Sequence, residues 1–121
     1  MLKQNEVVRL NSNRLEELYS QLGEAGAENI VCRALEELAV RLSHTERYYS
    51  DGRLAEMRKS ARSMVAIADQ IGMHMLSRVA ADVAACAGGS DLVATAATLS
   101  RLLRIGERSL SEVRDLQDVT N

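Results

Sequence analysis

Apolar residues recur every three or four positions along most of this chain, which is the spacing of a helix with one buried face. The clearest example lies in residues 53–71, where the steps alternate between three and four residues. Such a stripe predicts an amphipathic helix that packs against neighbouring helices. The apolar positions of this stripe are Leu54, Met57, Ala61, Met64, Ala68 and Ile71.

The same periodicity predicts five helical segments, separated by glycines and short polar turns. They cover residues 13–22, 28–48, 53–71, 73–87 and about 92–118. The expected N-terminal caps are Asn11 or Ser12, Asp51, and Ser90 or Asp91, and the expected ends or breaks are Gly23, Gly26, Gly72 and Gly88-Gly89.

The stripes predict an all-α fold, an antiparallel up-and-down helical bundle in which a four-helix core follows a short N-terminal helix. In the last helix, the apolar residues expected to point inward are Leu92, Ala96, Leu99, Leu103, Leu110, Val113 and Leu116. Over the whole bundle, the residues expected to be buried are Leu35, Leu38, Leu54, Met57, Met64, Ala68, Leu76, Val79, Leu99 and Leu103.

Composition supports the helical prediction and narrows the setting. Ala, Leu, Glu and Arg dominate the 121 residues, while Pro, Trp and Phe are absent. This length suffices for one domain, residues 1–121, with a core that needs no disulfides. The two cysteines, Cys32 and Cys86, have apolar neighbours, so buried reduced thiols are expected rather than a disulfide or redox pair. The expected compartment is the cytoplasm.

Charge and hydropathy exclude two classes of partner. The net charge of −2 lacks the basic excess that nucleic-acid binding requires. No apolar run approaches the length of a membrane span, and the first ten residues have no signal-peptide core. The sequence therefore predicts neither a nucleic-acid partner nor a membrane.

The chain offers little chemistry of its own. The two histidines, His44 and His74, stand in no metal-binding spacing, and neither cysteine has a base nearby in sequence. The neighbouring pairs Glu16-Glu17 and Glu36-Glu37 are interpreted as solvated helix faces. We therefore predict no metal site, no cofactor and no self-contained enzyme.

The central stretch ARSMVAIADQIGM, residues 61–73, followed by Leu76 and Ala80, resembles the motif of the histidine-containing phosphotransfer (HPt) domain. The segment NRLEELYSQLGEAGAENIVCRALEEL resembles the entry to such domains, and AGGSDLVATAATLSRL resembles the loop into their last helix. The resemblance covers about residues 11–110. It implies an HPt-like bundle in a bacterial two-component phosphorelay, with a response-regulator receiver domain or a histidine kinase as the partner.

The departures from the motif fall on its reactive positions. Arg62 stands at the phosphoacceptor histidine, Val65 at a lysine that faces the phosphoryl group, and Ala66 at a glycine that admits the partner. A guanidinium stays protonated and has no lone pair for attack, but it binds anions through several donors. The resemblance thus implies receiver docking without phosphotransfer. The expected docking residues are Arg58, Lys59, Arg62, Val65, Ala66 and Asp69.

Several alternatives stay open. The basic positions on this helix are equally well interpreted as a solvated face. His74, flanked by Met73 and Met75 and without a nearby lysine, is a candidate for a displaced phosphoacceptor or an ordinary surface histidine. The chain is also consistent with a structural or self-associating bundle whose likeness to HPt domains reflects shared packing rules. The sequence does not predict an oligomeric state.

Overall fold

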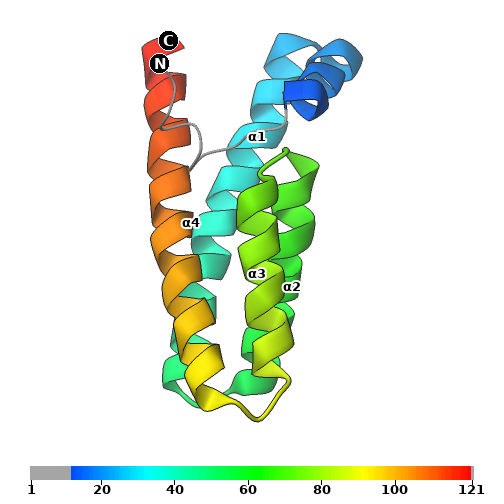
Figure 1. Cartoon of the computed structure of the whole chain (residues 1–121). Helices are drawn as coiled ribbons and strands as arrows, with labels where there is room; N and C mark the ends of the chain where they lie inside the picture. The colour runs from blue at the N-terminus through cyan, green and yellow to red at the C-terminus, as the bar shows by residue number, and fades with distance from the viewer. Residues whose placement is uncertain (1–11, 121) are drawn as a thin grey trace.

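The structure is a computed structural model that describes the backbone of residues 12–120 and the side chains of residues 13–113. Its elements are four helices, α1 (Ser12–Ser50), α2 (Leu54–Gln70), α3 (His74–Ala87) and α4 (Leu92–Thr120). Consecutive helices run antiparallel side by side, and α4 returns beside α1 to close the bundle (Figure 1). The predicted all-α up-and-down bundle is confirmed.

The first two predicted helices form one kinked helix, α1. Gly23 breaks the helical geometry with φ of 77° and ψ of 172°, a conformation that favours glycine. The stretch before Gly23 folds over the end of the bundle at an angle to the rest of α1 (Figure 1). The expected gap up to residue 28 is wrong, because the helix resumes directly after Gly23 and Gly26 is helical. Arg14 Nε donates to the Gln70 carbonyl oxygen at 2.8 Å, which ties this stretch to the end of α2.

A glycine turn joins α1 to α2. Gly52 has φ of 74°, its N–H bonds the Tyr49 carbonyl at 3.1 Å, and the Arg53 N–H bonds the Tyr48 carbonyl at 2.8 Å. These two bonds are those of a Schellman motif, which satisfies the last carbonyls of a helix. The expected capping role of Asp51 is wrong: Arg53 takes the N-cap position of α2, and no side chain bonds there.

The turn between α2 and α3 uses the same device. Gly72 has φ of 80°, its N–H bonds the Asp69 carbonyl at 3.1 Å, and the Met73 N–H bonds the Ala68 carbonyl at 2.8 Å. Met73 and Ala68 are both buried in one core cluster, the apolar contact that accompanies this motif. The predicted break at Gly72 is therefore confirmed, and the turn also fixes the register of α3 against α2.

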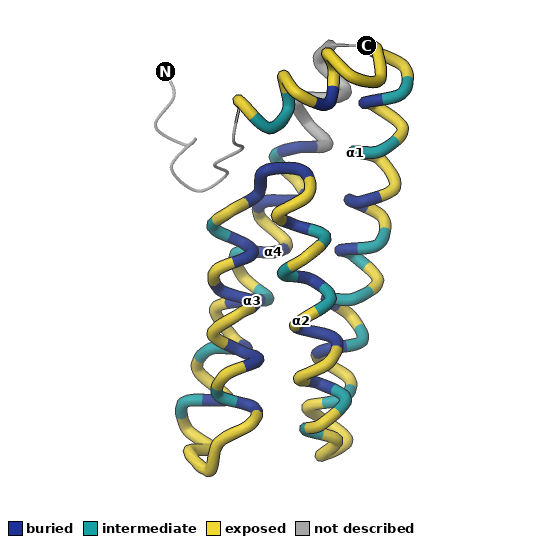
Figure 2. Tube along the Cα trace, turned by 90° about the vertical axis from the view of Figure 1, so that its right-hand side faces the viewer, coloured by how far each residue is buried: buried dark blue, intermediate teal, exposed yellow. Residues whose placement is uncertain are grey.

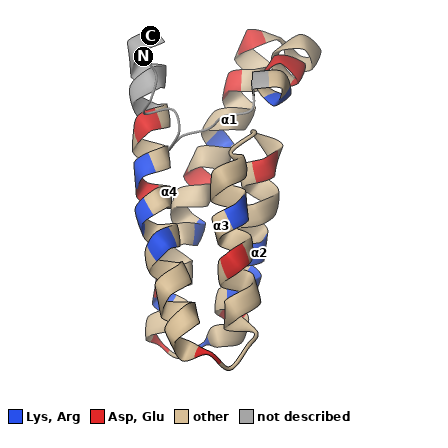
Figure 3. Cartoon of the chain, viewed as in Figure 1, with Lys and Arg blue, Asp and Glu red and all other residues tan. Residues whose placement is uncertain are grey.

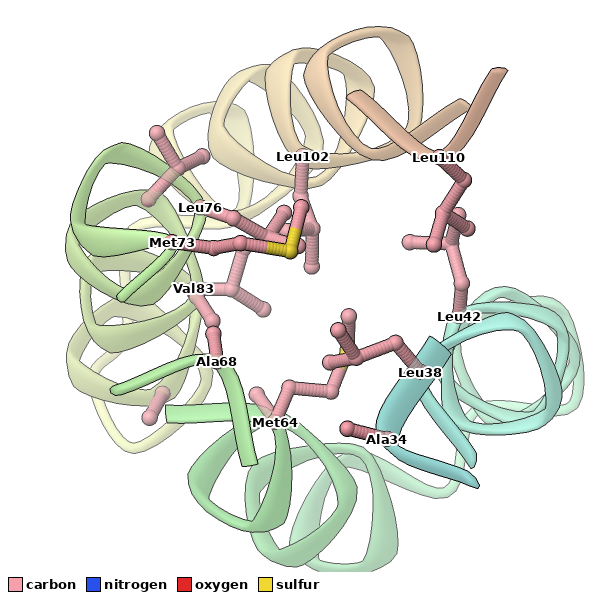
Figure 4. Packing of buried hydrophobic residues seen from close by; sticks show 14 of the residues in the cluster. Ala34, Leu38, Leu42, Met64, Ala68, Met73, Leu76, Val83, Leu102 and Leu110 are labelled. Carbon is pink, nitrogen blue, oxygen red and sulfur yellow. The ribbon is translucent and has the colours of Figure 1, made fainter. Parts of the chain in front are cut away.

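The core runs along the bundle axis between the four helices (Figures 2 and 4). Eight of the ten residues expected in the core are buried, while Leu54 and Leu103 are half-buried. Met57, Met64 and Met73 are also buried in the core. The burial expected for the thiols is wrong, because Cys32 is exposed and Cys86 is half-buried.

The inward face of α4 differs from the prediction at its start. Leu92 is 67% exposed and Ala96 is also exposed, whereas Thr95 and Leu102 are buried. The Asp91 side chain accepts the Ala94 N–H at 3.0 Å, which confirms this residue as the cap. The expected cap at Asn11 or Ser12 and the expected inward position of Leu116 lie outside the described side chains.

A small polar cluster is buried between α1 and α2. Thr45 Oγ1 lies 2.6 Å from the Arg41 carbonyl oxygen and 2.8 Å from Ser60 Oγ. Thr45 is fully buried, and Ser60 is nearly so. Each hydroxyl has a partner, which removes most of the cost of burying a polar group.

Candidate functional site

The exposed face of α2 carries most of the residues predicted for docking. Lys59, Arg62, Ala66 and Asp69 follow one another at steps of three and four residues, so they share one helix face. All four are exposed, because the apolar stripe of α2 occupies the opposite face. Arg62 lies at the middle of α2, with about two helical turns on either side of it. We call these four residues, together with Arg58, the α2 face.

Arg58 extends from the α2 face towards the end of α3. A Cβ atom added to Gly88 would lie 3.3 Å from the Arg58 Cζ atom, so the guanidinium packs directly against this glycine. Gly88 is the C-cap of α3. Because the C-terminal end of a helix carries partial negative charge, a cation is stabilised there. The Arg58 guanidinium is thus stabilised at the C-terminal end of α3.

The three cations of the α2 face are not neutralised by nearby carboxylates. Within the described residues, neither Arg58 nor Lys59 nor Arg62 forms an ion pair. The start of α2 differs, because a hydrogen bond to Glu56, and the charge of that carboxylate, raise the pKa of Arg53 above its ordinary value. The α2 face therefore carries three cations without an ion pair among the described residues, beside one carboxylate, Asp69, which lies 3.2 Å from His74 Nδ1.

Val65 differs from the other residues predicted for docking. It is half-buried and packs against the core cluster. A residue with this position offers only part of its side chain to a partner. It is the one member of the predicted set that the structure does not place in full contact with solvent.

His74 is the first residue of α3, beyond the Gly72 turn. Its Nδ1 atom lies 3.2 Å from Asp69 Oδ1, and the two side chains are each about half-exposed. If Nδ1 carries the proton, it donates to this carboxylate and the lone pair resides on Nε2. Gln70 lies eight positions after Arg62, which corresponds to about 12 Å along the helix axis, so His74 stands apart from Arg62.

The described side chains contain no group of three His, Cys, Asp or Glu residues that could hold a metal ion. Likewise, no helix in the described part of the chain has the length and hydropathy needed to cross a membrane.

The sequence did not predict two contacts of this site. Arg58 and Gly88 lie thirty residues apart, and a sequence pattern does not show that the end of α3 meets the side chain of Arg58 on α2. The contact between Asp69 and His74 is closer in sequence, and it depends on the tight turn at Gly72. The contact could have been predicted from Gly72, because this glycine lies between a carboxylate at the end of one helix and a histidine at the start of the next.

Comparison of the chain with protein-family models, with curated proteins and with solved structures finds no match. The resemblance to HPt domains therefore stays a prediction that rests on the residues quoted for it.

Proposed function

We propose that this chain is an HPt-like docking module of a two-component phosphorelay, which binds a receiver domain through the α2 face and accepts no phosphoryl group. One observation carries the proposal. Arg62 is exposed and without an ion pair among the described residues, at the position where the resemblance expects the phosphoacceptor histidine. A histidine kinase is the second partner that the same resemblance implies.

Binding follows from charge complementarity. In this proposal the guanidinium of Arg62 enters the acidic pocket of a receiver, where its several donors satisfy carboxylate oxygens. Arg58 and Lys59 flank it and add to the attraction at longer range. Such unpaired charges raise the association rate, and they make the affinity depend on ionic strength.

Transfer of a phosphoryl group fails for a separate reason. The acceptor must offer a lone pair to phosphorus while the bond to the receiver's aspartate breaks. The guanidinium of Arg62 keeps its protons at physiological pH and has no such lone pair. The protein therefore acts by occupancy: it binds the receiver and excludes that receiver's other partners.

Charge reversal at Arg62 tests the docking step. We expect Arg62→Glu to weaken binding to a cognate receiver by at least about tenfold, which is about 1.4 kcal/mol, and to reduce its salt dependence. Calorimetric titration at two ionic strengths measures both. Arg101→Glu is the matched control, because Arg101 is an exposed arginine of α4 without an ion pair among the described residues. Figure 3 shows that α4 also carries basic residues. Equal affinities of the two variants would assign the α2 face to solvent and favour a purely structural bundle.

The contact between Asp69 and His74 supports a second candidate function, phosphotransfer through His74. A carboxylate that accepts the Nδ1 proton leaves a nucleophilic Nε2, the form that phosphorylation of an imidazole requires. Against this candidate, the same carboxylate repels an approaching phosphoryl group. An acid-labile phosphoryl group that appears on the wild-type protein and disappears in His74→Gln would establish it.

A further inference from the structure

We propose that a hollow between α1 and α4, which we call the α1/α4 groove, docks a basic amphipathic helix of another protein. Of the four pairs of neighbouring helices, α1 and α4 are the least closely packed in the described part of the chain. The hollow between them has a volume of about 360 Å³. Its lining residues are Ala39, Leu42, Ser43, Glu46, Leu103, Glu107 and Leu110.

The base of the α1/α4 groove is apolar. Leu42 from α1 and Leu110 from α4 point towards one another there, and both are buried (Figure 4). Ala39 and Leu103 stand beside them, half-buried. Gly106 lets the helices approach at this level, since an added Cβ would lie 2.9 Å from a Leu42 methyl carbon. Leucine-sized side chains of a partner would find apolar contacts on both helices.

The rim of the groove is acidic. Glu46 lies one turn beyond Leu42 on α1, and Glu107 lies one turn beyond Leu103 on α4, so each helix supplies one carboxylate. Both glutamates are exposed, and neither forms an ion pair with a described residue. By contrast, Glu37 on α1 pairs with Arg41 at 2.8 Å. An apolar base between two unpaired carboxylates is complementary in shape and charge to one kind of partner.

That complement is a helix with an apolar stripe flanked by Lys or Arg. An amphipathic helix in a groove inserts side chains at positions i, i+3, i+4 and i+7, and here its basic flanks would meet Glu46 and Glu107. The volume is near the lower end of the range for small-ligand pockets, about 300–1,000 Å³, so it suits a few side chains. An acidic helix would bring like charges together at the rim and be disfavoured.

The α1/α4 groove lies apart from the α2 face. Within the described residues, α4 packs against α3 and α1 and makes no close contact with α2. The two surfaces therefore accept partners of opposite charge. The α2 face accepts the acidic pocket of a partner, and the α1/α4 groove accepts a basic helix. The inference does not depend on the proposed receiver docking.

A designed peptide tests the groove. The probe is a labelled helical peptide of about 18 residues, with leucines at the i, i+3, i+4, i+7 spacing and lysines on both flanks. In fluorescence anisotropy titrations, we expect saturable one-to-one binding of this peptide. A matched peptide with glutamate in place of lysine should bind at least about tenfold more weakly. Equal binding of both peptides, or of neither, would overturn the proposal.

Protein variants locate the binding. The double reversal Glu46→Lys with Glu107→Lys should weaken the basic peptide by at least about tenfold. Glu16→Lys with Glu24→Lys changes the net charge equally at exposed positions outside the groove and should keep the affinity within about twofold. Similar losses in both variants would overturn the proposal, because they would show attraction by net charge alone. Arg62→Glu should bind the peptide as the wild type does, whatever its effect on receivers.

Sedimentation of the wild-type protein tests the other occupant, a second copy of this chain. If the wild-type protein forms a dimer, we expect the double reversal at Glu46 and Glu107 to leave that dimer intact. A dimer that the double reversal dissociates, together with absent peptide binding, would overturn the proposal and assign the groove to self-association.

Discussion

Arg62 and a histidine at the same position would present different chemistry from the same helix face. Both reach solvent from the middle of α2, and both can meet an acidic pocket. The imidazole exists partly without its proton near neutral pH, whereas the guanidinium does not. The guanidinium of Arg62 therefore supplies no nucleophile at this position. The neighbours differ as well, since Val65 is half-buried against the core and Ala66 carries a methyl group on the exposed face.

Restoration of the reactive residues tests this reasoning. We expect Arg62→His alone to acquire little phosphoryl group from a phosphorylated receiver, because no cation stands over the transferred oxygens. Arg62→His with Val65→Lys and Ala66→Gly should acquire more. The lysine stem must run along the half-buried surface of Val65 to bring its ammonium to solvent. Phosphohistidine analysis of base-stable, acid-labile label measures the difference.

The triple variant is also expected to be less stable. Glycine in place of Ala66, in the middle of a helix, costs about 1 kcal/mol, so thermal melting should accompany each assay. His74→Gln in the triple background is the control for label at the other histidine. Equal label in the single and triple variants would contradict the roles given to Val65 and Ala66.

At the scale of helices, the periodicity predicted where helical segments lie better than it predicted which residues of α4 point towards the core. The breaks at Gly23 and Gly72 were readable from the sequence, because each takes a positive φ that other residues avoid. The inward face of α4 includes the small or polar residues Thr95, Gly106 and Ser109, which a search for apolar residues alone passes over. Leu92 joined the predicted stripe for the opposite reason: it is apolar and near the right spacing, yet exposed.

The two outcomes in α4 give a matched pair of leucines. Leu99 is 4% exposed and Leu92 is 67% exposed in the same helix. Leu99→Ala should lower the free energy of unfolding by about 2–5 kcal/mol, because it removes buried methyl groups and leaves a cavity. Leu92→Ala should change it by less than about 0.5 kcal/mol. Urea denaturation of both variants measures this, and similar losses would mean that the start of α4 faces the core as the apolar pattern alone suggested.

For the whole molecule, the sequence predicted the fold class and the exposed cations of α2, since both follow from which face of a helix is apolar. It did not predict contacts between distant segments. Arg58 against Gly88, and Leu42 against Gly106, arise from how the helices are arranged around the axis. The α1/α4 groove has the same origin, because Glu46 and Glu107 meet only when the last helix returns beside the first. The spacing of apolar residues along the sequence does not determine distances between residues on different helices.

The bundle as a whole thus presents two surfaces of opposite charge on a single core. On this account, the α2 face holds a receiver while the α1/α4 groove holds a basic helix, and the protein joins two partners without passing a phosphoryl group between them. Receiver docking is the central claim, since it gives the α2 face its role.

The most direct measurement is a parallel capture from extracts of the cell that the chain comes from. Wild-type protein and the Arg62→Glu variant are immobilised at equal density, and retained proteins are quantified by mass spectrometry. We expect proteins with receiver domains to be enriched on the wild type and reduced on the variant at least about fivefold, in line with the loss of an interfacial charge contact. Absence of receiver proteins from the wild-type capture, or equal retention by both proteins, would contradict it.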